Sequence, residues 1–429
     1  MAMKLDQIVQ QIFDALEKDY AGMPECNDGN ERQWVAICAR AEKGKILTDK
    51  LFYQYMQQRL AGLGDRNLCF LTGPDASYQP EGCGFKTRRF GDELYVTEVG
   101  ADTRLVPGDA IELINRNTPL KHLSYAVGNP TGSDDPERQD WSFFLTNSSH
   151  FTVRHADGSR ADIRTRRFPS AEALPVRPCS FTVLCDGTCV LTVTQLDNEE
   201  AAELLASHAE EAARAPRLVF DLRLCSGGIE SMTYPLLNWL FDEATNLNEV
   251  LEPEVVLTNY TATNCAHREA QIAQLRKLAE LQGDEAEGLG WLDENLAAVR
   301  ANRGKGYVEE TVQPEDMPIA AAPAGQKVLV LTDTATADAA EWFASVARKA
   351  PRATLVGRAT AGSLDYSNPL AMAFDNRFIF VYPMSKTKAA AEGRGMRGVG
   401  IVPDVVVPFT PEECTRDLVM EHALALQAL

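Results

Sequence analysis

The chain has 429 residues and a formal net charge of −19, because its 61 acidic residues outnumber its 42 basic ones. This acidic balance disfavours nucleic acid and anionic membrane surfaces as partners. The length exceeds that of one ordinary hydrophobic core, which predicts two or three domains, and no window is long and apolar enough to predict a membrane span.

Helices are predicted in the first domain, residues 1–66. Apolar residues at helical spacing form two stripes, which are Ile8, Ile12, Phe13 and Leu16 and then Leu51, Phe52, Tyr55, Met56 and Leu60. A helix with such a stripe buries it against another element. We therefore interpret this domain as a packing cap on the rest of the protein.

Short strands and turns replace helices in the second predicted domain, residues 67–172. Strands are predicted at residues 93–99 and 105–115, and a hairpin is predicted at residues 151–163. They follow a loop made of Gly82, Cys83, Gly84 and Phe85. This order resembles a PDZ domain, in which such a loop captures a peptide carboxylate with backbone N–H groups while the peptide adds a strand to the sheet. A plain tight turn is the alternative interpretation of the loop.

The third predicted domain, residues 173–429, opens with a hairpin at residues 181–196 and a polar helix at about 198–213. Residues 218–223 then form an apolar run typical of a buried strand, which ends in Cys225, Ser226, Gly227 and Gly228. Glycines leave backbone N–H groups able to face a ligand. Such a turn is suited to hold an oxyanion.

Two helices, at residues 266–282 and 292–301, are predicted inside an insertion at about residues 250–312, which is a lid or a surface decoration. A second buried strand, at residues 328–331, leads through a turn of small residues into a helix that starts near Ala339. Thr410 and Glu413 form a capping-box pattern, which predicts the start of the C-terminal helix.

Four segments carry a family resemblance, at residues 221–228, 336–341, 356–362 and 398–404. In this order and spacing they resemble the tail-specific (C-terminal processing) serine protease family, including its tricorn-like and retinoid-binding-protein-like relatives. The resemblance implies an α/β fold with a crotonase-like α/β spiral core, the small PDZ-like β domain and the N-terminal helical region. Periodicity by itself predicts only a mixed α/β protein.

The same resemblance assigns roles to residues of the turns. It places Asp338 at the nucleophile position, where the family has serine, and Ser363 at the base position, where lysine-type members have lysine. Tricorn-like members instead place a histidine base in the hairpin, at Thr192 in the best alignment. The implied oxyanion donors are the backbone N–H groups of Gly227 or Gly228 and of Ala339.

The carboxylate of Asp338 decides the functional hypothesis. We expect it to be ionised at neutral pH, because a helix N-terminus favours negative charge, and it would compete with a peptide oxyanion for the same donors. Activation of water by a carboxylate requires a second carboxyl group that shares the proton, and the sequence offers no local candidate. The alternative to a catalytic role is that Asp338 is the N-cap of the following helix.

The leading hypothesis is a pseudoprotease that binds extended peptides or protein C-termini, with a homo-oligomer left open. We expect it in the cytoplasm, because the N-terminus lacks an apolar export signal and the ten cysteines lack a paired spacing. The scattered cysteines and six histidines predict no metal, and no cofactor is expected. One alternative is an active serine-type peptidase with a displaced nucleophile or base, such as Ser363, a histidine, or Cys225, although a buried cysteine is usually inert. An engineered Asp338 in an active protease is a further alternative, against which the missing lysine argues.

Overall fold

The computed structural model describes residues 3–23, 48–125, 131–282 and 289–426. The chain forms two compact units. Unit 1 contains Met1–Gln79, Glu254–Val312 and Asp365–Gly395, and unit 2 contains Pro80–Pro253, Gln313–Leu364 and Met396–Leu429. Each unit therefore combines stretches that are distant in the chain, and the consecutive division at residues 66 and 172 stays a prediction. Within the described ranges, no helix has both the length and the apolar character that a membrane crossing requires.

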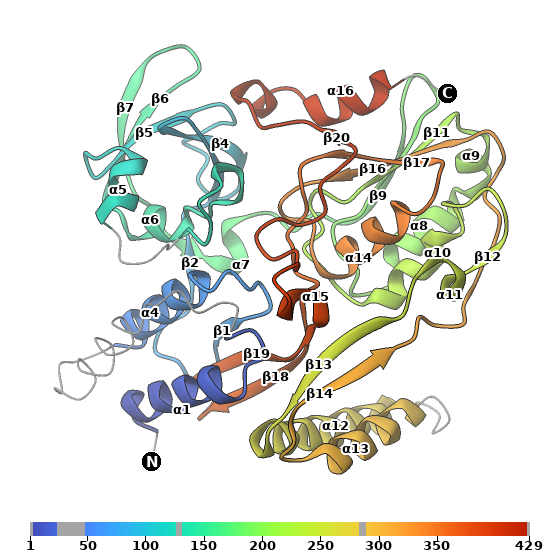
Figure 1. Ribbon diagram of the computed structural model, residues 1–429. Coiled ribbons are helices and arrows are strands. Elements are labelled where there is room, and N and C mark those ends of the chain that lie inside the picture. The colour runs from blue at the N-terminus through green and yellow to red at the C-terminus, as the bar shows by residue number, and fades with distance from the viewer. Residues whose placement is uncertain (1–2, 24–47, 126–130, 283–288, 427–429) are drawn as a thin grey trace. The chain divides into compact units, whose positions relative to one another are not determined.

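Unit 1 is organised around an antiparallel sheet of strand order β1-β19-β13-β14, with β18 also paired to β19 (Figure 1). Its strands are β1 (Cys69–Thr72), β13 (Glu254–Tyr260), β14 (Gly306–Val312), β18 (Tyr366–Phe374) and β19 (Phe378–Thr387). Its helices are α1 (Leu5–Lys18), α4 (Asp49–Ala61), α12 (Ala262–Gln282), α13 (Gly290–Asn302) and α15 (Lys388–Ala391).

The two N-terminal helices bury their predicted stripes in the core of unit 1. The buried members are Ile8, Ile12 and Leu16 of α1 and Phe52, Met56 and Leu60 of α4. They pack with aromatic residues of the sheet, and the ring of Phe52 meets that of Phe70 edge-on at a centroid distance of 5.5 Å. Leu51 was expected in the stripe, but it is 43% exposed because it lies beside the buried face rather than on it.

The core of unit 2 is a sheet of order β20-β17-β16-β11-β10-β9, in which β9 alone is antiparallel to its neighbour. Its strands are β9 (Ser180–Val183), β10 (Cys189–Thr192), β11 (Arg217–Asp221), β16 (Lys327–Thr332), β17 (Ala353–Gly357) and β20 (Val405–Val406). The helices of this part are α8 (Glu200–Ser207), α9 (Ala209–Arg214), α10 (Tyr234–Leu237), α11 (Leu247–Val250), α14 (Asp338–Ala347) and α16 (Leu418–Ala425), with 3₁₀ turns η2 (Glu230–Thr233) and η4 (Pro411–Cys414). A short pair, β12 (Thr245–Asn246) and β15 (Pro318–Ile319), lies outside the sheet.

Both faces of this parallel sheet are covered, which explains why its strands are continuous apolar runs. One face packs against α8 and α14 through Leu218, Phe220, Val328, Val330 and Leu355. The opposite face packs against α16 through Val219, Leu329, Leu331 and Val356. Because side chains alternate along a strand, neighbouring residues of β11 and of β16 pack into the cores on opposite faces of the sheet.

A second, antiparallel sheet in unit 2 has the order β3-β4-β5-β6-β7. Its strands are β3 (Phe85–Phe90), β4 (Glu93–Val99), β5 (Ala110–Ile114), β6 (His150–Arg154) and β7 (Arg160–Arg164), and we call this part the small β region. It also contains α5 (Pro119–Tyr125), η1 (Pro136–Arg138) and α6 (Ser142–Asn147), and it is joined by β2 (Glu81–Gly82), β8 (Phe168–Pro169) and α7 (Ser170–Ala173). The predicted hairpin is the β6–β7 pair, in which Phe151 lies opposite Ile163.

Two local predictions differ from the structure in detail. The polar helix predicted after the first hairpin is divided at His208 into α8 and α9, and the His208 ring stacks on Phe181 at a centroid distance of 4.4 Å. The C-terminal helix α16 is capped by Asp417, which accepts from the Met420 N–H at 2.9 Å, and not by a Thr410 capping box. Glu413 takes no part in capping because its carboxylate binds the buried guanidinium of Arg358.

We expect Phe343→Ala to destabilise unit 2 by about 3–5 kcal/mol, because it empties a fully buried ring site. Phe343 of α14 is 0% exposed and meets Phe220 of β11 at a ring distance of 5.1 Å. Urea unfolding followed by fluorescence measures the change. The control is Phe90→Ala, at a ring that is 46% exposed, and equal effects of the two substitutions would contradict this account of the core.

Candidate functional site

The turn between β16 and α14 is tied to the turn that follows β11. The Thr336 hydroxyl donates to the Leu222 carbonyl at 3.0 Å, and the Ala337 N–H donates to the Cys225 carbonyl at 3.2 Å. Thr336 Oγ1 also accepts from the Asp333 N–H at 3.0 Å. The parallel pairing of β11 with β16 therefore brings together two of the predicted segments at the carboxyl ends of their strands.

The glycines after β11 are required by close contacts. Gly227 and Gly228 have φ angles of 140° and 136°, which side chains rarely adopt. A Cβ on Gly228 would stand 2.4 Å from the Leu196 carbonyl carbon, and one on Gly227 would stand 2.8 Å from the Asp338 Cβ. The carboxylate of Asp338 therefore faces the glycine turn, and its Oδ2 accepts a long hydrogen bond of 3.5 Å from the Gly228 N–H.

Asp338 begins α14 but does not cap it. Ala337 occupies the N-cap position, so the prediction of an Asp338 N-cap is wrong. The reason lies in the backbone, because Asp338 has a left-handed φ of 51° that turns its side chain towards Gly227 and Gly228 instead of the first turn of the helix. Left-handed backbone at a residue other than glycine is strained and concentrates at functional sites.

Ser363 lies beside the backbone of Asp338. Its Oγ accepts from the Asp338 N–H at 2.7 Å and donates to Glu341 Oε2 at 2.7 Å. The structure therefore brings the predicted base position next to the predicted nucleophile position. The group present there is a hydroxyl that is already held by two partners.

Glu341 is the site residue that sequence reasoning missed. Its side chain is 0% exposed, and it accepts hydrogen bonds from the Gly362 N–H, the Ser363 N–H, the Ser363 hydroxyl and the Thr360 hydroxyl. The signal in the sequence was an acid three residues after Asp338, at the end of the segment at residues 336–341. Its burial, which is rare for an acid unless several donors satisfy it, is visible only in the structure.

Two further backbone N–H donors belong to the turns of this site. Among the described residues, the N–H groups of Gly227 and Ala339 have no hydrogen-bond acceptor. Ala339 is in the first turn of α14, where N–H groups lack a partner within the helix. These N–H groups and that of Gly228 are the ones to which the resemblance assigns an oxyanion.

The sequence from residue 187 to residue 407 matches the model of peptidase family S41. The chain belongs to this family. The match includes all four segments that suggested the tail-specific proteases, so that resemblance and the α/β fold it implies are confirmed.

Solved structures agree with the family at the level of the fold. Mature CPAF complexed with lactacystin is 14% identical over 98% of this chain and 96% of its own, with a TM-score of 0.64. A CPAF mutant gives a TM-score of 0.66, also at 14% identity, over 98% and 95% of the two chains. The photosystem II D1 C-terminal processing protease is 13% identical over 96% and 94%, with a TM-score of 0.45. At 14% identity, the likeness to the two CPAF structures establishes the fold alone.

Two other nucleophilic groups of this S41 site, Cys225 and Thr336, are buried and hydrogen-bonded. Cys225 is fully buried, burial raises the pKa of its thiol to about 11, and the thiol donates to the Gly227 carbonyl. The Thr336 hydroxyl is buried and donates to the Leu222 carbonyl.

The histidines of unit 2 form hydrogen bonds with other residues. His208 and His422 bond the carbonyls of Leu204 and Leu418, and His155 bonds Asp109. His122 and His150 likewise bond the Ile114 carbonyl and Ser149. Within the described ranges, no three His, Cys, Asp or Glu side chains form a group suited to a metal.

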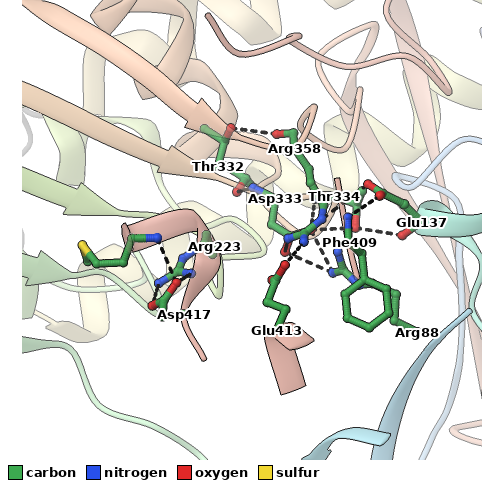
Figure 2. Close-up of polar contacts among 12 residues, drawn as sticks. Arg88, Glu137, Arg223, Thr332, Asp333, Thr334, Arg358, Phe409, Glu413 and Asp417 are labelled. Carbon is green, nitrogen blue, oxygen red and sulfur yellow. Dashed lines mark hydrogen bonds and ion pairs between the residues drawn. The ribbon is translucent and has the colours of Figure 1, made fainter. Parts of the chain in front are cut away.

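A network of buried charges holds the start of the turn between β16 and α14, which we call the nucleophile turn (Figure 2). Arg88 of β3 places one guanidinium nitrogen 2.9 Å and 3.0 Å from the two carboxylate oxygens of Asp333. Arg358 is 2% exposed and contacts Asp333 at 3.1 Å, Glu137 at 3.4 Å and Glu413. Burial acts to raise the pKa of Asp333, but Arg88 and Arg358 outweigh it and lower the pKa. Arg88 is thus paired within the protein.

A separate ion pair anchors the glycine turn. Arg223 binds Asp221 at 2.7 Å. It also binds Asp417 at 2.7 Å (Figure 2), so the end of β11 is connected to the start of α16. The buried carboxylate of Asp221 requires a cation, and Arg223 provides it.

The Asp338 carboxylate has a raised pKa, mainly because surrounding protein removes part of its hydration. The charges of Glu341 and Asp197 raise the pKa further, and the Gly228 N–H acts in the opposite direction. A helix N-terminus by itself favours ionisation of a carboxyl group. Desolvation and two like charges are stronger here.

We expect Asp338→Asn to raise the melting temperature at pH 7. A raised pKa means that the folded state binds the proton more tightly, so ionisation costs stability as the pH rises from the ordinary value of 3.8 through the folded value. The gain should therefore vanish below about pH 4. Differential scanning calorimetry across this range measures it, with the exposed Asp92→Asn as control. A parent protein that is more stable than the variant at pH 7 would refute this electrostatic account.

We expect Asp333→Asn to destabilise unit 2 by roughly 3–5 kcal/mol, because it leaves two buried guanidinium groups without their shared carboxylate. The effect should decline as the pH falls below 3.8, where the lowered pKa of Asp333 is reached and the parent loses the same charge. Urea unfolding at two pH values measures it, and an effect no larger than that of Asp92→Asn would show that the network contributes little.

Proposed function

We propose that this S41 homologue is a pseudoprotease that binds extended peptides or protein C-termini without cleaving them. One observation carries the proposal, namely the Asp338 carboxylate that faces the glycine turn and accepts from the Gly228 N–H. A hydroxyl at this position attacks a carbonyl, whereas a carboxylate would form an acyl anhydride, a poor intermediate for amide hydrolysis.

The electrostatics of the turn support the same conclusion. The oxyanion of a tetrahedral intermediate is stabilised by N–H donors that point to it in advance. Here one of these donors already has a negatively charged acceptor, and a second anion beside Asp338 would be repelled. Peptide binding without hydrolysis avoids this repulsion, because a peptide carbonyl is neutral.

The two groups beside Asp338 do not provide a base. The Ser363 hydroxyl already accepts from the Asp338 N–H and donates to Glu341. Glu341 accepts hydrogen bonds at both carboxylate oxygens. An acid pair that activates water must share a proton between its carboxyl groups. Glu341 instead uses its lone pairs for the loop at residues 360–363, so it serves as an anchor.

Peptide capture is assigned to the loop before β3 in the small β region, which we propose is PDZ-like. The side chains of Cys83 and Phe85 are buried in the core of this region, and the Gly84 carbonyl accepts from the Gly100 N–H at 2.9 Å. Among the described residues, the N–H groups of Cys83 and Gly84 have no acceptor. Such N–H groups suit a peptide carboxylate, and β3 is an edge strand to which a peptide can pair.

We expect peptides with an apolar C-terminus to bind and to remain intact. Fluorescence anisotropy with labelled peptides measures binding, and mass spectrometry of the same samples measures cleavage. Amidation of the peptide C-terminus should weaken binding by roughly tenfold or more, since a charged hydrogen bond is lost. Gly84→Ala should also weaken it, because Gly84 has a φ of 80° and a Cβ would stand 2.7 Å from the Asp102 nitrogen.

Gly91→Ala is the matched control. Gly91 has a φ of 61° in the turn between β3 and β4, and nothing lies within 4 Å of its Cβ position, so strain is similar but the loop is untouched. Cleavage beyond one turnover by the parent protein would overturn the pseudoprotease. Equal binding of free and amidated peptides would overturn the proposal that the loop before β3 binds a peptide carboxylate. It would not bear on the proposal that the protein lacks a nucleophile.

A serine-type peptidase is the second candidate, because the Ser363 hydroxyl donates to a carboxylate in the same site. In that case Ser363→Ala would abolish turnover and Asp338→Asn would not. We further propose a cytoplasmic location, supported by the free state of every cysteine that the structure describes.

A further inference from the structure

A cavity of about 290 Å³ lies within unit 1, between one face of the sheet and the hairpin of α12 and α13. Val256, Thr258 and Tyr260 alternate along β13 and line its floor. Glu310 of β14 lies opposite Val256 in the register and shares this face. The volume is close to the lower end of small-molecule sites, which are roughly 300–1,000 Å³.

Arg268 stands at the wall of this cavity without a counterion among the described residues. The Arg268 guanidinium donates to Gln271 Oε1 at 2.8 Å and to Asn368 Oδ1 at 2.7 Å, and both acceptors are neutral amides. Arg268 forms no ion pair with a described residue. Burial lowers the pKa of Arg268, which is the mark of a desolvated charge that lacks a compensating anion.

Asn368 is positioned to support this cation. It has a left-handed φ of 56° at an irregularity of β18, between the paired residues Ser367 and Pro369. Its amide nitrogen donates to Ser385 Oγ at 3.0 Å, which directs its oxygen to Arg268. Strained backbone that is held by such contacts is typical of ligand sites.

Acidic groups line the same cavity. Glu310 Oε1 accepts from the Tyr260 hydroxyl at 2.8 Å, and its second oxygen has no partner in the described part of the chain. Glu294 of α13 is exposed at the cavity and forms no ion pair with a described residue. A ligand with only a carboxylate would be repelled by these two acids, and one with only an ammonium group would meet Arg268.

We propose that this cavity binds a free α-amino acid as its zwitterion. The α-carboxylate would bind Arg268 and the α-ammonium group would bind Glu310, with Glu294 nearby. Planar guanidinium groups suit carboxylates. An apolar side chain would contact Val256, Val299 and Met384. This proposal goes beyond the proposed function and does not depend on it, because every residue that it uses belongs to unit 1.

Isothermal titration calorimetry with the full chain and L-leucine tests the proposal. We expect saturable binding, with 4-methylpentanoate, which lacks the amine, and 3-methylbutylamine, which lacks the carboxylate, each weaker by roughly tenfold or more. Arg268→Gln should weaken leucine binding by a similar factor. Lys277→Gln, the same change at an exposed residue of α12, should leave binding within about twofold.

Glu310→Gln separates a ligand contact from a folding defect. It should weaken leucine binding but not that of 4-methylpentanoate, and melting curves without ligand show whether each variant is folded. Binding of 3-methylbutylamine as tight as that of leucine would overturn the zwitterion. So would leucine binding that Arg268→Gln leaves unchanged, or no heat from any of the common amino acids at concentrations on the order of 10 mM.

Discussion

The buried carboxylate of Glu341 is the contact on which the geometry of the S41 site depends. It accepts hydrogen bonds from two backbone N–H groups and two hydroxyls of the segment at residues 360–363, and so it connects the first turn of α14 to the loop after β17. A buried charge is tolerated only when donors replace water around it. The hydrogen bonds to Glu341 therefore fix the position of Ser363, and the Ser363 hydroxyl accepts from the Asp338 N–H.

The charge at residue 338 must be understood together with this anchor. Asp338 and Glu341 lie in one turn, where the charge of Glu341 contributes to the raised pKa of Asp338, and the backbone N–H groups beside Asp338 suit an anion. The site thus retains backbone N–H donors, and the like charges beside them are the basis for our proposal that it binds peptides without hydrolysing them. The strained φ of Asp338 belongs to the same backbone and is compatible with either chemistry.

Charge pairs elsewhere in unit 2 maintain this backbone. Arg358 and Arg88 neutralise Asp333 at the start of the nucleophile turn, and Arg223 connects Asp221 to Asp417 beside the glycine turn. Because these groups are largely withdrawn from water, the loss of one partner costs more than the pair contributes. In unit 1, by contrast, Arg268 has no carboxylate partner among the described residues, and its contacts with two neutral amides are the basis of the ligand site proposed there.

The sequence by itself determined the local structure and the family. The buried strands, the glycines and the order of four short segments follow from side-chain polarity and backbone freedom, which are properties of neighbouring residues. They sufficed for the mixed α/β fold, for the S41 family and for the pairing of Asp338 with the glycine turn. The division into units, the Ala337 cap, the role of Glu341 and the cavity beside Arg268 were decided only by tertiary structure. Each depends on hydrogen bonds or burial between residues far apart in the chain, and the free energy of a buried charge is set by surroundings that no local pattern contains.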